Sequence, residues 1–189
     1  CAAISIIFCM ALQGVSKLYA KFLKNPYIRI VAASAIIIVI TLFLRTSDYM
    51  GAGNNLIELA VENGQARPLD FFWKLVLTAL TMRAGFRGGE IVPSFCIGAT
   101  FGCIMGHLIG LSPSICAAAG MAALFCGVTN CPITSILIAF ELFGFAGMPY
   151  FCTVIAVSYL LSGYQSLYKA QKIVYSKTEN KYIDRNTTS

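Results

Sequence analysis

Charged side chains are almost missing from the second half of this sequence, and this constrains the fold more than any other feature. Between Glu90 and Lys169 the only acidic or basic residues are Glu141 and the single histidine, His107. The whole chain is 58% hydrophobic and 12% charged, whereas a soluble domain carries about 25% charged residues. A soluble fold of this length needs a charged face. The sequence therefore predicts an integral, multi-pass membrane protein.

Glycine and proline divide the apolar sequence into segments. We predict that each segment is helical, because lipid offers no partner for unpaired backbone groups. The predicted helices are 1–23, 28–44, 56–61, 69–82, 91–111, 115–128, 133–143, 150–161 and 166–175. Several contain only about 11 to 16 residues, whereas a perpendicular crossing needs roughly 20. Helices broken inside a membrane line a cavity or are buried in protein. The pattern favours an all-α transporter or channel with short, broken and re-entrant helices.

One glycine-rich turn, Gly85-Phe86-Arg87-Gly88-Gly89-Glu90-Ile91-Val92-Pro93, joins two predicted helices. Its glycines have no Cβ and allow close approach to the backbone. The helix that follows begins with unpaired N–H groups and a partial positive charge, which together bind anions. We therefore expect an anion site at mid-membrane depth. The expected site residues in this turn are Gly88, Gly89, Glu90 and Ile91.

Basic residues account for the net charge of +6. They cluster at the ends of apolar segments, as in membrane proteins with positively charged cytoplasmic loops, so we do not predict nucleic-acid binding. Trp73 and Lys74 are expected at the membrane interface. The glycines at 98, 102, 106 and 110 share one helix face and predict close helix packing.

Other kinds of site are weakly supported. The eight cysteines form no C-x-x-C pair, so neither a disulfide framework nor a metal site is predicted. Glu58 and Glu62 indicate either a solvated face, which we favour, or a cation site. His107 is either a packing residue, which we favour, or a proton relay. The motifs H-E-x-x-H and G-x-S-x-G are absent from the sequence, so an enzyme is not predicted.

Several motifs, taken in order, resemble a known family. Gly88-Gly89-Glu90-Ile91-Val92-Pro93 resembles the G-x-F-x-P anion-site motif of ClC proteins. Residues 119–142 are similar to the family pattern A-G-M-x-A, then P-x-T, then E. Ser166-Leu167-Tyr168 resembles the start of the last family helix, and residues 51–57 resemble a glycine loop before the anion-site half. The chain thus resembles the C-terminal half of a ClC-family chloride channel or chloride/proton antiporter.

This resemblance implies an all-α fold of two inverted halves. Residues 1–168 correspond to most of the second half, and residues 169–189 to the end of the last helix and a basic cytoplasmic tail. The resemblance also implies a bound chloride or other halide, with no other cofactor, and a Tyr168 hydroxyl that donates to this ion. The implied partners are the lipid bilayer of the cell membrane, the missing N-terminal half and a second copy of the protein. Ile136 and Ile155 are expected at the dimer contact.

The sequence departs from the family motif at two positions of the turn. Ile91 replaces the family's phenylalanine, which leaves the main-chain donors in place. Glu90 adds a carboxylate, and we expect it to face protein or a basic partner such as Arg87, although it can also act as a tethered anion that competes for the site. The gating glutamate and filter serine of the family belong to the other half, so this chain does not distinguish a channel from an antiporter. A secondary transporter of another small substrate is a further alternative. Tyr168 favours chloride over fluoride.

Overall fold

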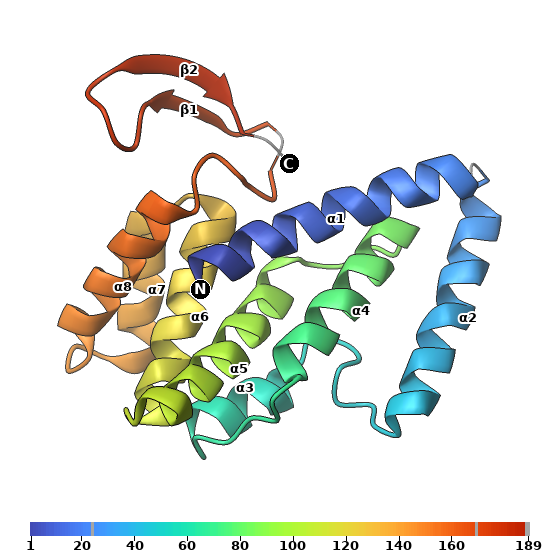
Figure 1. Cartoon of the computed structure of the whole chain (residues 1–189), viewed down its shortest axis with the longest axis horizontal. Helices are drawn as coiled ribbons and strands as arrows, with labels where there is room; N and C mark the ends of the chain where they lie inside the picture. Colours follow the sequence, from blue (N-terminus) through green and yellow to red (C-terminus); the bar gives the residue numbers. More distant parts are fainter. Residues whose placement is uncertain (24, 169, 188–189) are drawn as a thin grey trace.

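A computed structural model describes residues 1–23, 25–168 and 170–187 (Figure 1). Four residues lie outside the described ranges: Lys24, Lys169, Thr188 and Ser189. Lys24 and Lys169 belong to the predicted basic segments. The helices are α1 (Ala2–Phe22), α2 (Pro26–Leu44), α3 (Asn54–Val61), α4 (Asp70–Ala84), α5 (Ile91–Ile109), α6 (Pro113–Thr129), α7 (Pro132–Phe143) and α8 (Met148–Leu161). The strands are β1 (Lys172–Tyr175) and β2 (Tyr182–Asn186). The first eight predicted helices are thus confirmed.

Proline, asparagine and glycine set the helix ends, as the sequence predicts. Pro26, Pro113 and Pro132 occupy first-turn positions, where the missing N–H costs no hydrogen bond. Asn25 also accepts a hydrogen bond from the Tyr27 N–H at 3.0 Å. Asn130 ends α6 in the left-handed conformation with φ of 55°. These breaks keep α6, α7 and α8 short.

The centre of the molecule is α6, which is buried on all sides from Ala117 to Thr129. Helix α5 packs closely against it. A Cβ at Gly102 would lie 2.1 Å from the Cys116 carbonyl oxygen, and one at Gly98 would lie 2.6 Å from that of Gly120. The predicted small-residue stripe therefore packs helix against helix. Gly110 differs, because it ends α5 with φ of 78°.

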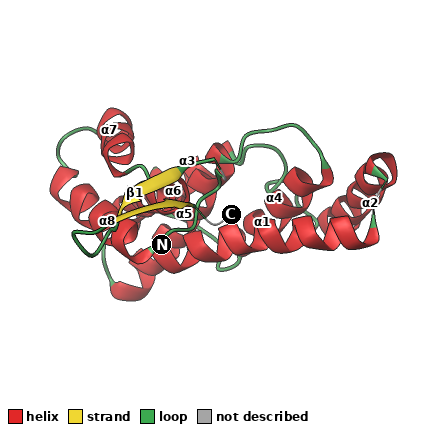
Figure 2. Ribbon diagram, turned by 90° about the horizontal axis from the view of Figure 1, so that it is seen from above, coloured by secondary structure: helices red, strands yellow, loops and turns green. Residues whose placement is uncertain are grey.

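Helix α1 runs along the molecule, with α2 at one end and α7 and α8 at the other (Figures 1 and 2). Three helices, α1, α2 and α5, are long and apolar enough to cross a membrane. Only 6% of the most apolar stretch of α2 is buried within the chain. Its exposed leucine, isoleucine and phenylalanine side chains need lipid or another protein segment as their solvent.

The prediction of a last helix over residues 166–175 is wrong. A turn follows α8, and the antiparallel hairpin of β1 and β2 replaces the second half of the predicted helix. Ile173 pairs with Arg185 and Tyr175 with Tyr182. The segment Lys172–Tyr175 contains β-branched and aromatic residues that suit a strand. Apart from this hairpin, the described elements are all helical.

Candidate functional site

The glycine-rich turn connects α4 to α5 in the predicted position. Gly85 ends α4 with φ of 111°, a conformation that favours glycine. Glu90 is the N-cap of α5, and the first backbone hydrogen bond of this helix runs from the Ser94 N–H to the Glu90 carbonyl at 3.2 Å. Within the described chain, the N–H groups of Glu90, Ile91 and Val92 have no hydrogen-bond partner. The turn therefore presents unpaired donors at a helix N-terminus.

Gly88 and Gly89 stand immediately before these donors. Neither has a positive φ. A Cβ at Gly89 would meet no atom within 4 Å, and one at Gly88 would meet only Met82 Sδ at 3.5 Å. Both residues are also exposed. Packing within the chain therefore does not require glycine here, in contrast to Gly98 and Gly102.

The Glu90 carboxylate pairs with a basic side chain. Its Oε1 lies 3.4 Å from Nη2 of Arg83, which is in the last turn of α4. The expectation that Glu90 faces a basic partner is therefore confirmed, but the partner differs from the expected Arg87. Arg87 is exposed and has no ion pair among the described residues. Arg83 in the last turn of α4 and Glu90 at the start of α5 thus pair across the glycine turn.

A cavity of about 520 Å³ lies beside the turn, between α2, α4 and the start of α5. Most of its wall is apolar, and hydroxyl groups contribute a few polar positions. The lining residues are Ser34, Ile37, Ile38, Tyr49, Met50, Gly51, Ala52, Leu77, Thr78, Thr81, Met82, Phe86, Gly88, Gly89, Val92 and Pro93. Gly88 and Gly89 thus lie at a hollow of the molecule, as an ion site requires.

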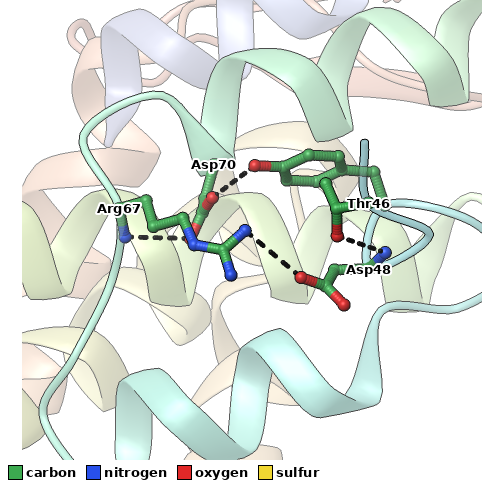
Figure 3. A network of polar contacts seen from close by, with 5 residues as sticks. Thr46, Asp48, Arg67 and Asp70 are labelled. Carbon is green, nitrogen blue, oxygen red and sulfur yellow. Dashed lines mark hydrogen bonds and ion pairs between the residues drawn. The ribbon is translucent and has the colours of Figure 1, made fainter. Parts of the chain in front are cut away.

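A polar network fixes the loop that forms one wall of this cavity (Figure 3). The Tyr49 hydroxyl donates to Asp70 Oδ1 at 2.7 Å, and the Arg67 N–H donates to Asp70 Oδ2 at 2.9 Å. Arg67 also pairs with Asp48 at 3.2 Å. Burial, together with the hydrogen bond to Asp70, raises the pKa of Tyr49 to about 12. The hydroxyl therefore stays protonated and remains a donor at neutral pH.

Lys74 holds the same loop from inside. Its side chain is buried, and Nζ donates to the carbonyl oxygens of Tyr49 at 3.1 Å and Gly51 at 2.7 Å. Lys74 is therefore buried within the chain, and its expected position at the membrane interface stays a prediction. Two backbone carbonyls satisfy part of the hydrogen-bonding capacity of the buried amine.

Tyr168 lies in the turn that follows α8, and its side chain is 46% exposed. Its N–H donates to Ser166 Oγ at 3.2 Å, and its carbonyl accepts from Thr187 Oγ1 at 2.7 Å. The neighbouring Leu167 is buried in the core cluster that includes Ile97 of α5. Throughout the described ranges, no hydrogen bond joins Tyr168 to the glycine turn. The last segment thus reaches the α5 core, but the structure does not bring its hydroxyl to the turn.

The other candidate residues are placed as follows. Glu58 and Glu62 are exposed, and the described residues contain no group of three potential metal ligands. His107 Nε2 lies 2.7 Å from the Gly64 carbonyl oxygen, which fits the packing role. The cysteines are free. The sequence did not predict the roles of Lys74 and Arg83, the two basic residues of α4, because a basic residue in an apolar helix does not reveal its partner.

Comparison with known proteins assigns the family. The sequence profile described as "Voltage gated chloride channel" matches residues 1–163. The chain belongs to this family. Members of the voltage gated chloride channel family are integral membrane proteins, in agreement with the exposed apolar helices of this chain.

Individual members of the voltage gated chloride channel family are similar over most of this chain. A chloride/fluoride channel protein of Pseudomonas syringae pv. tomato is 36% identical over 135 residues, or 71% of this chain and 30% of that protein. The H(+)/Cl(-) exchange transporter ClcA of Vibrio cholerae is 27% identical over 72% of this chain and 32% of its own length. The crystal structure of a CLC-type fluoride/proton antiporter superposes with a TM-score of 0.85 and 33% identity, covering 88% of this chain and 42% of that one.

The resemblance and the predicted fold are thereby confirmed. The high TM-score extends the likeness from the sequence motifs to the arrangement of the helices. The chain spans between 30% and 42% of the length of these relatives. It therefore contains one part of the fold that each relative possesses.

Proposed function

We propose that this chain forms the second half of a membrane pathway for chloride, fluoride or a related halide. The observation that carries the proposal is the start of α5. Unpaired N–H groups of Glu90 and Ile91 stand behind Gly88 and Gly89, two exposed glycines that packing within the chain does not require. The missing Cβ atoms leave room for an ion to approach the donors.

A halide suits this chemistry. It is spherical and needs several N–H or O–H donors, while a full positive charge would hold it too tightly for transport. The helix N-terminus supplies partial charge, and Tyr168 is proposed to add a hydroxyl once the complete protein is assembled. The names of the relatives include chloride and fluoride. No further cofactor is proposed beyond the bound halide.

The proposed parent protein comprises this chain and a first half that supplies the remaining ion contacts and the gate. We infer this division from the coverage of the relatives, which is 42% for the antiporter structure. The parent protein is proposed to lie in the cell membrane as a homodimer with a cytoplasmic C-terminus. It acts as a channel or as a halide/proton antiporter, and recording proton movement during halide flux distinguishes the two.

Halide binding to the purified parent protein tests the site. Titration calorimetry with sodium chloride and with sodium fluoride is expected to show saturable binding of at least one halide. Gly89→Leu should abolish it, because the new side chain blocks the approach to the N–H groups. Gly14→Leu is the matched control, since a Cβ at Gly14 also meets no atom within 4 Å but lies on α1. Equal binding by the parent protein and Gly89→Leu would contradict the proposal.

Tyr168→Phe tests the contribution of the last segment in the same titration. Loss of one neutral hydrogen bond removes roughly 0.5–1.5 kcal/mol net, so binding should weaken about 2- to 12-fold. Unchanged binding would leave the turn as the anion site and remove Tyr168 from it.

A further inference from the structure

Two tyrosine rings meet on the C-terminal hairpin. Tyr175 of β1 pairs with Tyr182 of β2, and the rings lie edge to face with their centres 5.8 Å apart. Each tyrosine is 63% exposed, and the neighbouring Val174 is 41% exposed. Cross-strand aromatic pairs stabilise a hairpin, but this pair leaves most of its surface open to a partner outside the described residues.

The closed end of this hairpin is attached to the end of α8. Lys177 Nζ donates to the Tyr159 carbonyl at 2.9 Å and to Ser162 Oγ at 3.3 Å. Figure 1 shows α8 at the outer edge of the molecule, on the same side as the closed end of the hairpin. Tyr175 precedes Lys177 by two residues, which corresponds to about 7 Å of extended chain. The tyrosine pair therefore lies only a short distance beyond the last turn of α8.

The last turn of α8 marks a change from apolar to polar surface. Leu160 and Leu161 are 48% and 65% exposed, and the polar segment 162–166 follows them. In an integral membrane protein, such a change falls near the edge of the hydrocarbon region. The headgroup layer beyond that edge is roughly 5–8 Å thick on each side. The short distance from α8 thus puts the tyrosine pair at the depth of the headgroups.

Charge contributes little to the partner that this surface suits. The exposed charged residues of the hairpin are Lys172, Lys181, Arg185, Glu179 and Asp184, and Lys172 pairs with Asp184 at 3.8 Å. The excess of one basic residue raises binding to an anionic lipid surface only about fivefold. Tyrosine rings, in contrast, are enriched at membrane interfaces, because one end of the ring is apolar and the hydroxyl end is polar.

We propose that Tyr175 and Tyr182 anchor the hairpin in the phospholipid headgroup layer beside α8. The rings contact the lipid just outside the hydrocarbon region, and the hydroxyl groups contact phosphate or water. Contact with a second copy of the chain, or with water alone, is the outcome that the experiment must separate from this one. The inference requires the membrane class of the chain and does not depend on the proposed halide function.

Tyr182→Trp turns the pair into a reporter and keeps an aromatic ring in place. The parent protein and this variant are reconstituted into phosphatidylcholine vesicles, and the difference between their emission spectra isolates the new tryptophan. A nitroxide attached to the lipid headgroup should quench this emission strongly, whereas a nitroxide deep in the acyl chain should quench it weakly. Replacing half of the lipid by phosphatidylglycerol should change the quenching little. Quenching by soluble acrylamide with none by either nitroxide lipid would show that the pair faces water. Absence of quenching by all three would show that protein covers the pair, and either result would overturn the inference.

Hydrogen exchange of residues 172–186 tests the same contact without a tryptophan. The parent protein should be more protected in lipid nanodiscs than in amphipol. Tyr175→Ser with Tyr182→Ser should lose this lipid-dependent gain, and Tyr175→Phe with Tyr182→Phe is the matched control that should keep it. A merely structural role of the pair would lower protection equally in both media. Equal protection of the parent protein in the two media, or an unchanged gain in the serine variant, would contradict the inference.

Discussion

Single glycines serve two separate purposes in this chain. At Gly98, Gly102 and Gly120, a Cβ would lie between 2.1 and 2.6 Å from a backbone oxygen of the facing helix, so these residues permit α5 and α6 to touch. At Gly88 and Gly89, the nearest atom lies 3.5 Å away or beyond 4 Å. The sequence separates the two groups by spacing, because the glycines within α5 recur every four residues, whereas Gly88 and Gly89 stand together in a turn between Arg87 and Glu90.

Alanine substitution distinguishes the two groups by stability. Gly102→Ala should destabilise the protein by about 1–3 kcal/mol or more, because the new Cβ overlaps the α6 backbone. Gly89→Ala should change stability by less than about 0.5 kcal/mol, as expected for an exposed position. Thermal unfolding of the detergent-solubilised parent protein measures both changes. Equal midpoints for the two variants would contradict the packing assigned to α5 and α6.

Among the elements, the C-terminal hairpin differs most from the expectation. Lys177, in the loop between β1 and β2, reaches the ends of α6 and α8. Its Nζ donates to Asn130 Oδ1, to the Tyr159 carbonyl at 2.9 Å and to Ser162 Oγ at 3.3 Å. It also lies 4.1 Å from the centre of the Tyr159 ring. These hydrogen bonds attach the hairpin to the ends of α6 and α8.

The hairpin should dock more firmly as the pH rises from about 8 to 10.5. Burial lowers the pKa of Lys177 to about 8, against 10.5 for an unburied lysine. A detached hairpin therefore holds more protons within this window, and raising the pH shifts the equilibrium toward the docked form. Hydrogen-exchange protection factors for residues 172–186, referenced to unstructured peptide rates at each pH, measure the effect.

Lys177→Met should lower these protection factors and remove their dependence on pH, while Lys181→Met on the exposed part of the hairpin serves as the control. Protection that falls with pH in the parent protein, or that is unchanged in Lys177→Met, would contradict the role of Lys177.

Helices α7 and α8 form the proposed dimer contact, but the residues expected there need correction. Ile155 is completely buried against α6 and α7 residues, and Ile136 is half-buried in the same cluster. The exposed apolar side chains include Ile133 and Leu137, which are 74% and 59% exposed. A period of 3.6 residues identifies an apolar helix but cannot show which apolar face meets the same chain.

Leu137→Trp should therefore raise the monomer fraction of the parent protein in detergent, because a larger side chain disturbs a fitted contact between copies. Leu42→Trp, on the exposed apolar face of α2 at the other end of the molecule, is the matched control. Multi-angle light scattering after size-exclusion chromatography measures the fraction. An unchanged dimer fraction in Leu137→Trp would count against this contact.

For the whole molecule, the sequence predicted the membrane class, eight of the helices and the glycine turn. These features depend on local chemistry: apolar runs, proline at helix starts and glycine or asparagine at helix ends. The pairing of Glu90 with Arg83, the burial of Lys74 and the pairing of β1 with β2 depend on how separate elements meet. A residue type within one element does not specify which residue of another element it contacts.

Halide flux from liposomes measures whether the start of α5 forms part of a halide pathway. Halide release from vesicles containing the parent protein is recorded with an ion-selective electrode, for chloride and fluoride in turn, together with pH. We expect saturable release of at least one halide by the parent protein, loss of this release in Gly89→Leu, and no release by residues 1–189 alone. Undiminished release by Gly89→Leu would show that the start of α5 lies outside the halide pathway. Saturable release by residues 1–189 alone would show that the pathway does not need the proposed first half.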